Sequence, residues 1–181
     1  LLDNSSQYQM NLHCLLLIDL DRFKEVNDVL GHNNGDILIK KVAQRIKSLV
    51  PRTSYLARVG GDEFAVVFVN LHSHEEASDI AQSIIRAVDS RFVFDGYDLY
   101  LSASAGLAYT DQGVLDFIDL YRNADAALNK AKISGKNCLQ YFSPKLHQDI
   151  TERLIKLRKL RDAVAQEAFV LYYQPKVNIK T

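Results

Sequence analysis

The sequence has no excess of charge of either sign. Its 181 residues include 22 Lys and Arg against 22 Asp and Glu, which gives a formal net charge of zero and a pI near 7.1. A surface that binds nucleic acid or anionic membrane needs a surplus of Lys and Arg. We therefore expect no nucleic-acid partner, although a few local basic residues can still bind a nucleotide.

Cysteines and long apolar runs are also scarce. The two cysteines, Cys14 and Cys138, lie in short apolar runs without metal-ligand spacing, so we expect buried free thiols in a reducing compartment. No stretch resembles a signal peptide or a transmembrane helix. We expect a cytoplasmic location and no membrane segment in this chain. Since the chain starts abruptly at Leu1, we also expect a longer parent protein, in which a preceding segment could act as a sensor or membrane anchor.

The apolar content, 48% of the residues, is sufficient for one core and therefore for one full domain plus a fragment. Apolar positions alternate between helix and strand periods. They predict helices at 23–30, 36–49, 74–90 and 115–133, a loop at 31–35, and strands at 12–18, 55–69 (a hairpin), 92–109 (turning at Asp95-Gly96) and 138–142. This order predicts an α+β fold, a βαββαβ core whose mostly antiparallel sheet carries helices on one face.

The tip of the expected hairpin is rich in glycine and acid. Gly60, Gly61, Asp62 and Glu63 stand between two apolar runs, and we expect the glycines to supply the positive φ of a tight turn. Two adjacent carboxylates repel each other. They become useful when a divalent cation lies between them and a phosphate.

A second acidic cluster follows the apolar run 12–18, where the sequence continues Asp19-Leu20-Asp21. Either cluster alone is better explained as a solvated acidic turn or a helix cap. Two such clusters at neighbouring strand ends favour an oxygen-rich Mg²⁺ site, because Mg²⁺ takes one or two protein carboxylates and completes its shell with water and phosphates.

Four motifs resemble those of the GGDEF domain, the fold of diguanylate cyclases: DLDRFKEVND at 19–28, GHNNGD at 31–36, RVGGDEF at 58–64 and NADAALNKAKISGKN at 123–137. The resemblance covers residues 11–142, and we assign 1–143 to such a domain. It implies a ferredoxin-like fold similar to the palm of nucleotidyl cyclases and polymerases. It also implies the condensation of two GTP molecules into cyclic di-GMP and pyrophosphate.

The resemblance implies a guanine site at Asn27 and Asp36. Guanine offers adjacent N1–H and N2–H₂ donors, which a carboxylate can accept together. The alternative for Asp36 is an ordinary helix N-cap. His32 is a substrate neighbour in some relatives, but a surface loop histidine is the simpler interpretation.

The phosphates are expected near Lys24, Lys132 and Lys136, with Phe23, Gly60 and Gly61 close to the nucleotide. Relatives more often carry Arg at the position of Lys136, so this chain keeps the charge and loses the bidentate fork. The alternative for each lysine is a solvated helix surface, and for Phe23 a place in the core.

The implied mechanism uses two Mg²⁺ ions, with Mn²⁺ as a substitute, held by Asp19, the Leu20 carbonyl, Asp62 and Glu63. Asp62 is assigned by resemblance to removal of a proton from the ribose 3′-hydroxyl. Since one domain binds one GTP, the active species is expected to be a homodimer.

Residues 144–168 are expected to form a connecting helix, and 169–181 the first strand of a truncated EAL domain, the cyclic di-GMP phosphodiesterase that often follows a GGDEF domain. The acids that carry phosphodiesterase metals lie further on in that family, so no hydrolase activity is expected here. Two function classes therefore compete: a working cyclase, and a GTP-binding module that regulates the phosphodiesterase.

An inhibitory site for the product is not expected. Many diguanylate cyclases carry Arg-x-x-Asp ending five residues before the first glycine of the hairpin. These positions read Pro51-Arg52-Thr53-Ser54 in this chain, so the first position has no cation and the last no carboxylate.

Overall fold

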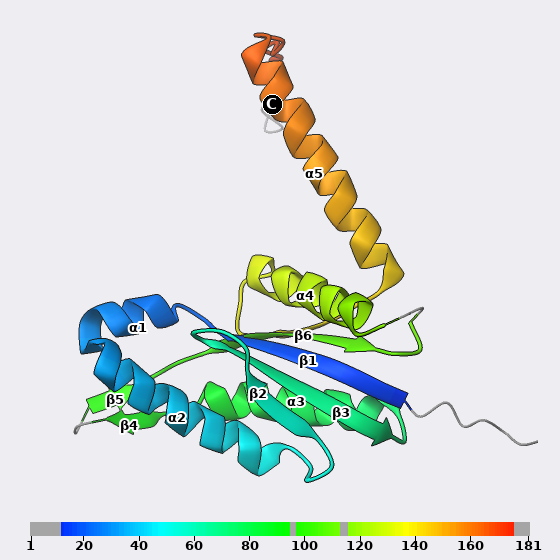
Figure 1. The fold of residues 1–181 in the computed structure, drawn as a ribbon. Helices are drawn as coiled ribbons and strands as arrows, with labels where there is room; N and C mark the ends of the chain where they lie inside the picture. Colours follow the sequence, from blue (N-terminus) through cyan, green and yellow to red (C-terminus); the bar gives the residue numbers. More distant parts are fainter. Residues whose placement is uncertain (1–11, 95–96, 113–115, 176–181) are drawn as a thin grey trace, which may run out of the picture. The chain divides into compact units, whose positions relative to one another are not determined.

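The structure is a computed structural model that describes residues 12–94, 97–112 and 116–175. The chain divides into two compact units, Leu1–Pro144 and Lys145–Thr181. In the first unit the elements follow in the order β1 (Leu12–Leu20), α1 (Phe23–Leu30), α2 (His32–Leu49), β2 (Tyr55–Arg58), β3 (Glu63–Leu71), α3 (His74–Val88), β4 (Phe92–Phe94), β5 (Tyr97–Leu99), β6 (Ala103–Tyr109), α4 (Phe117–Ile133) and β7 (Leu139–Tyr141) (Figure 1).

The main sheet has five strands in the order β2-β3-β1-β6-β7. Every neighbouring pair is antiparallel except β6 and β7, which run parallel. Strands β4 and β5 form a separate two-stranded sheet. The expected α+β class and the mostly antiparallel sheet are confirmed, and β6-β1-β3-β2 with the intervening helices is the βαββαβ core.

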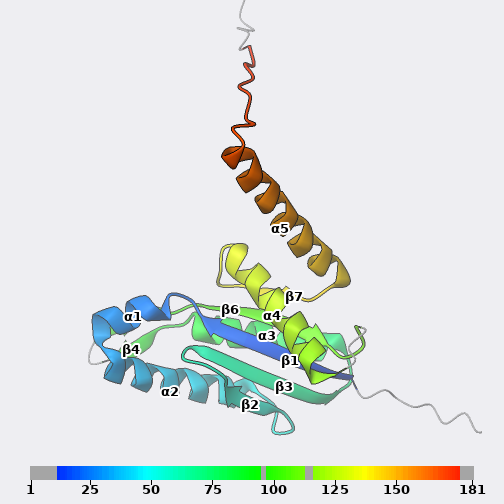
Figure 2. The same cartoon turned by 45° about the horizontal axis from the view of Figure 1, so that its top comes forward.

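Helices cover both faces of the sheet, so the prediction of helices on one face is wrong. Helix α4 packs on β6 and β1 from one side, while α2 and α3 lie against the other (Figures 1 and 2). The α2 and α3 face holds the large core, in which Leu16 and Ile18 of β1 pack with Val42 of α2 and Ile84 of α3. Leu15 and Leu17 point to the opposite face and are also buried, because side chains alternate along a strand.

Gly106 of β6 allows α4 to approach the sheet closely. A Cβ built on Gly106 would lie 2.1 Å from the backbone nitrogen of Leu128 and 2.2 Å from the carbonyl oxygen of Ala124. No side chain can be accommodated at these distances. This contact fixes α4 over β1, and α4 carries the lysine-bearing segment toward the end of that strand.

Several boundaries differ from the sequence prediction. Helix α2 begins at His32 rather than Asp36, so residues 32–35 are helical and not a loop. Strand β1 extends to Leu20, α3 ends at Val88 and α4 begins at Phe117. The expected turn at Asp95-Gly96 lies outside the described residues. Cys14 is buried as predicted, whereas Cys138 is only partly buried, and both are free.

The second unit consists mainly of α5 (Pro144–Ala165), which agrees with the helix expected there. Residues 168–175 form no strand, and the side chains of Phe169–Tyr173 are exposed. The assignment of this segment to a following domain stays a prediction. Among the described residues, no helix combines the length and apolar character needed to span a membrane.

Candidate functional site

The C-terminal end of β1 places Asp19 in the middle strand of the sheet. Asp19 faces Glu63 of β3 in the antiparallel register and Ser104 of β6 on the other side. Opposed residues of an antiparallel pair point to the same face, so Asp19 and Glu63 share the face covered further along by α4. The backbone nitrogen of Leu20 donates to the carbonyl oxygen of Asp62 at 3.2 Å, which ties the hairpin to the strand end.

Opposing influences act on the pKa of the Asp19 carboxylate. Burial raises its pKa above the ordinary value, and the negative charges of Asp62 and Asp21 raise it further. The opposing influence is Lys132 of α4, whose Nζ donates to Asp19 Oδ2 at 2.6 Å. The chain therefore brings two of its predicted metal-site carboxylates, Asp19 and Asp62, into electrostatic contact, and places one predicted phosphate-binding lysine directly on Asp19.

The hairpin turn is held by an arginine that the sequence reasoning did not single out. Arg58 donates through Nε and Nη2 to the carbonyl oxygen of Gly61 at 3.1 and 2.7 Å, and through Nε to that of Gly60 at 3.2 Å. The expected hairpin is confirmed, but the positive φ expected for its glycines is wrong. Within the described residues, the glycines with positive φ are Gly31 and Gly135.

The predicted guanine site contains a buried acceptor without a partner. Asn27 lies on α1, and its Oδ1 has no hydrogen-bond partner although it is shielded from solvent. Gly35 of α2 lies directly against it, since a Cβ on Gly35 would be 1.8 Å from Asn27 Oδ1 and 3.5 Å from Cζ of Phe23. Only glycine leaves this oxygen its space. Phe23 is buried in the core, below Asn27 and Gly35, so the structure supports a packing role for this residue.

Asp36 is not a helix cap. It lies inside α2, whose N-cap position is Gly31 with no side-chain cap hydrogen bond, so the alternative explanation of Asp36 from the sequence is wrong. The carboxylate is exposed and forms a long ion pair with Arg58, with Nη2 at 3.9 Å from Oδ1. His32 is the first residue of α2 and is exposed, so its expected place in a loop is also wrong.

The remaining predicted lysines lie on either side of Asp19. Lys24 is an exposed residue in the first turn of α1. Lys136 is exposed in the segment that follows α4 and has a left-handed backbone, with φ of 66°. Together with Lys132, these residues place three cationic side chains on segments that border the end of β1.

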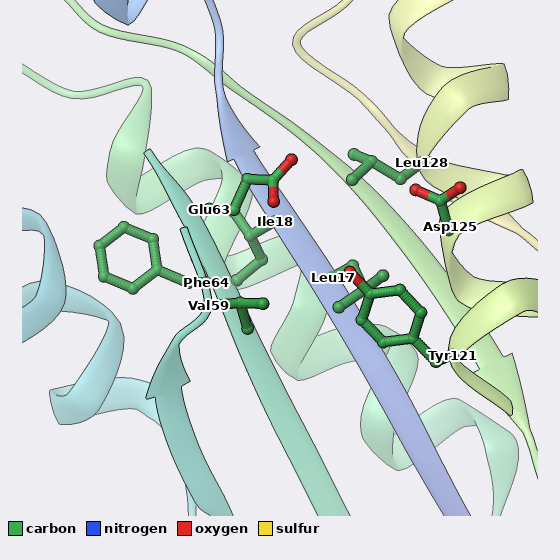
Figure 3. A pocket seen from close by; sticks show the side chains of 8 residues that line it. All are labelled: Leu17, Ile18, Val59, Glu63, Phe64, Tyr121, Asp125 and Leu128. Atoms are coloured by element: carbon green, nitrogen blue, oxygen red, sulfur yellow. The ribbon is translucent and has the colours of Figure 1, made fainter. Parts of the chain in front are cut away.

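A small cavity of about 10 Å³ lies between the hairpin, β1 and α4. Its lining includes the carboxylates of Glu63 and Asp125, which extend from β3 and α4, together with Leu17 of β1 and Tyr121 of α4 (Figure 3). A volume of this size holds about one water molecule. This cavity is therefore too small to hold a nucleotide.

The metal-binding capacity of the site depends on what else is bound. Among the described residues, no three His, Cys, Asp or Glu side chains are grouped closely enough to hold a metal ion by themselves. The Asp19 and Asp62 carboxylates and the Leu20 carbonyl are oxygen donors, and the mutual repulsion of the two carboxylates favours a cation between them. This donor set fits an ion such as Mg²⁺, which relies on substrate phosphates for the rest of its shell.

Comparison with known proteins agrees with this geometry. A family model described as "Diguanylate cyclase, GGDEF domain" matches residues 1–138. The chain belongs to this family. It is 37% identical over 164 residues to the bifunctional diguanylate cyclase/cyclic di-GMP phosphodiesterase MucR of Pseudomonas aeruginosa, a match that covers 90% of this chain and 24% of MucR.

Two further relatives of this GGDEF chain bear on its use. The cyclic di-GMP phosphodiesterase NbdA of Pseudomonas aeruginosa is 35% identical over 161 residues, covering 89% of this chain and 20% of NbdA. The chain thus spans a quarter or less of the length of MucR and NbdA. The structure of the active GGEEF domain of a diguanylate cyclase from Vibrio cholerae matches with a TM-score of 0.67 and 33% identity, covering 73% of this chain and 83% of that one.

Arg58 and Gly35 are the site residues that the sequence reasoning missed. Arg58 begins the RVGGDEF motif and Gly35 lies in the GHNNGD motif, so both belong to motifs identified from the sequence. Their roles depend on which backbone atoms they meet. Arg58 recognises carbonyls of its own turn, and Gly35 leaves space for a side chain of the preceding helix, neither of which a motif states.

Proposed function

We propose that the first unit is a diguanylate cyclase domain, which condenses two GTP molecules into cyclic di-GMP and pyrophosphate. The observation that carries the proposal is the buried, unpartnered Oδ1 of Asn27, packed against Gly35, with the exposed carboxylate of Asp36 on the next residue. A buried polar atom without a partner is costly in a protein interior, and it is expected where a ligand supplies the partner. Arg58 links this pair to the hairpin, because it lies 3.9 Å from Asp36 and donates to the carbonyl oxygen of Gly61.

Guanine matches this pair of acceptors. The N1–H and N2–H₂ groups of guanine are adjacent donors, and they can be divided between the Asp36 carboxylate and Asn27 Oδ1 once the Asn27 side chain turns away from Gly35. Adenine has an acceptor in place of the N1–H donor and no amine at C2, so it would leave at least one of these oxygens unpaired. The proposal therefore includes selection of GTP over ATP.

The triphosphate is proposed to lie over the end of β1. Lys24, Lys132 and Lys136 would bind its oxygens, and Gly60 and Gly61 would let the backbone approach closely. Lys132 donates to Asp19 in the structure, and the ammonium would then turn toward the phosphates as Asp19 takes a cation. Asp19, Asp62, Glu63 and the Leu20 carbonyl would hold two Mg²⁺ ions, or Mn²⁺ in their place.

The chemistry forms one ester and breaks one anhydride in each of two steps. The 3′-oxygen of one GTP bonds to the α-phosphorus of the other, the bond to the β-phosphate oxygen breaks, and pyrophosphate leaves. The proton of the 3′-hydroxyl is assigned to Asp62, which also orients the hydroxyl. Bound Mg²⁺ would supply charge neutralisation for the triphosphate and a lowered pKa for the attacking hydroxyl. Since each domain binds one GTP, two copies must face each other as a homodimer.

A GTP-binding regulatory module is the second candidate. It is favoured by the similarity to NbdA, which is described as a cyclic di-GMP phosphodiesterase, and by the fact that this chain covers only 20% of it. In this case the site would bind Mg²⁺–GTP and control a following EAL phosphodiesterase domain without turnover. The two candidates share the binding site and differ in whether the nucleotide reacts.

Product analysis separates them. The protein is incubated with GTP and Mg²⁺ at several protein concentrations, and the nucleotides are separated by anion-exchange chromatography. For a cyclase, the rate of cyclic di-GMP formation should rise more than in proportion to the protein concentration, because the active species is a dimer. Saturable GTP binding with no product would favour the regulatory module, and absence of GTP binding would contradict both.

A further inference from the structure

Asp21 is a buried carboxylate that the proposed reaction does not use. It is 6% exposed and lies two residues after Asp19, just beyond the end of β1. Its Oδ1 accepts from Ser104 Oγ at 2.7 Å, and its Oδ2 accepts from Ser102 Oγ at 2.8 Å and from the backbone nitrogen of Asn137 at 3.0 Å. A buried charge is tolerated only when donors satisfy it, and here three donors do so.

These hydrogen bonds join three separate parts of the chain. Asp21 itself follows β1, Ser102 and Ser104 lie just before and at the start of β6, and Asn137 belongs to the segment between α4 and β7. The backbone nitrogen of Asp21 also donates to the carbonyl oxygen of Ser102 at 2.9 Å. The Asp21 carboxylate is therefore a junction between the strand that ends in Asp19 and the segment that carries Lys136.

The segment that carries Lys136 has an unfavourable backbone. Gly135, Lys136 and Asn137 have φ of 115°, 66° and 47° in succession. Left-handed conformations are unfavourable for residues with a side chain, and they persist only where surrounding contacts hold them. The Lys136 nitrogen donates to the carbonyl oxygen of Ala131 at 3.1 Å, and the next backbone donor is the one bound by Asp21.

We propose that Asp21 is a positioning residue for nucleotide binding, which acts by holding the 135–137 backbone so that Lys136 is directed to the triphosphate. This inference rests on the proposed function. Lys132 does not depend on Asp21 in the same way, because it lies within α4 and already contacts Asp19. The effect of Asp21 should therefore be transmitted through Lys136 and little through Lys132.

The test compares Asp21→Asn, Lys136→Ala and the double variant. Asn has the size of Asp and keeps one oxygen that can accept from a serine hydroxyl. It lacks the negative charge, and its NH₂ group replaces the oxygen that accepts from Ser102 and the Asn137 nitrogen. Affinity is measured with Mg²⁺ and 3′-deoxy-GTP, which lacks the attacking hydroxyl and cannot react. Each single variant should weaken binding by about tenfold, as for loss of one charge-assisted contact. The double variant should be no weaker than Asp21→Asn alone.

Asp89→Asn is the matched control. Asp89 Oδ2 accepts from the side-chain amide of Asn137 at 3.0 Å. This variant therefore changes a contact of the Asn137 side chain and keeps the hydrogen bond from its backbone nitrogen to Asp21. It should leave the affinity for 3′-deoxy-GTP unchanged. An equal loss in Asp89→Asn would overturn the specific role of the Asp21 contact.

Amide hydrogen exchange in the ligand-free protein tests the structural step independently of GTP. The Asn137 amide should exchange slowly in the wild type and at least about tenfold faster in Asp21→Asn, since its acceptor is lost. An unchanged exchange rate of the Asn137 amide in Asp21→Asn overturns the inference. So does a loss of 3′-deoxy-GTP affinity on Lys136→Ala that is as large in the Asp21→Asn protein as in the wild type. A wild-type protein that binds no nucleotide contradicts the proposed function instead, and exchange at Asn137 still decides whether Asp21 orders the segment.

Discussion

The two ends of β1 differ in how completely the polar groups around them are satisfied. At the N-terminal end, the backbone of His13 exchanges hydrogen bonds with Thr110, and its Nδ1 accepts from the Asn70 nitrogen at 3.1 Å. At the C-terminal end, Asn27 Oδ1 has no partner and the pKa of Asp19 is raised by burial and by like charges. The first arrangement is satisfied within the fold, whereas the second leaves an acceptor unpaired and like charges close together.

This difference is what we expect if the C-terminal end of β1 binds a ligand and the N-terminal end does not. Sites that must recognise a ligand often keep groups whose partners are absent from the free protein. The N-terminal end of β1 is thus an internal control for the C-terminal end. Variants at the C-terminal end should therefore lose activity, and variants at the N-terminal end should keep it.

The largest expected effect is the loss of turnover in Asp62→Ala. This change removes a metal ligand and the group assigned to the 3′-hydroxyl proton, so product formation should fall by at least ~10²-fold. Folding should survive, because Asp62 lies in a hairpin turn at the sheet end. Asp111→Ala at the opposite end, which breaks an ion pair with His74, should leave turnover unchanged. Equal losses in both variants would remove the distinction between the ends.

A smaller effect is expected for Asp36→Ala, which tests base recognition. GTP binding should weaken by about 1 to 3 kcal/mol, because guanine donors are left unpaired, and ATP binding should change much less. Asp79→Ala removes an exposed helical carboxylate from α3 and serves as the control. Calorimetric titrations in which GTP and ATP lose affinity equally would contradict a base-reading role for Asp36.

Asp19→Asn should abolish cyclase activity without loss of stability. Because the folded-state pKa of Asp19 is raised, its ionisation disfavours the fold, and this penalty grows as the pH rises through the raised pKa. The variant should therefore unfold in urea at neutral pH with an equal or slightly higher free energy, by less than ~1 kcal/mol after solvent screening. The difference should vanish below the ordinary carboxyl pKa. A marked destabilisation at neutral pH would show that Asp19 serves the fold.

The smallest expected effect concerns the product. Pro51 and Ser54 stand where the inhibitory motif has its cation and its carboxylate, so added cyclic di-GMP should leave the initial rate nearly unchanged in the cyclase assay. The groove at this place is lined by Lys47, Arg52 and Tyr55 among others, and it offers no acidic side chain in the described residues. Tight product inhibition abolished by Arg52→Ala would contradict this expectation.

The sequence was informative where function depends on neighbours along the chain. The hairpin, the end of β1 and the motif at the end of α4 were predicted, and the contact of Lys132 with Asp19 joins two of these motifs. The unbroken apolar run in β1 also indicated burial on both faces, which the prediction of one helical layer overlooked. The unpartnered Asn27 and its dependence on Gly35 could not be predicted, because they arise from how α1 and α2 pack.

The most direct test of this comparison is an NMR titration of the ¹⁵N-labelled protein with Mg²⁺ and 3′-deoxy-GTP. The account predicts saturable shifts for the Asn27 side-chain amide and for the backbone amides of Gly61 and Lys136, with little change at His13 and Asn70. An equivalent titration with 3′-deoxy-ATP should produce much weaker shifts at Asn27. Shifts concentrated at His13 and Asn70, or identical shifts with both nucleotides, would contradict the placement of a guanine nucleotide at the C-terminal end of β1.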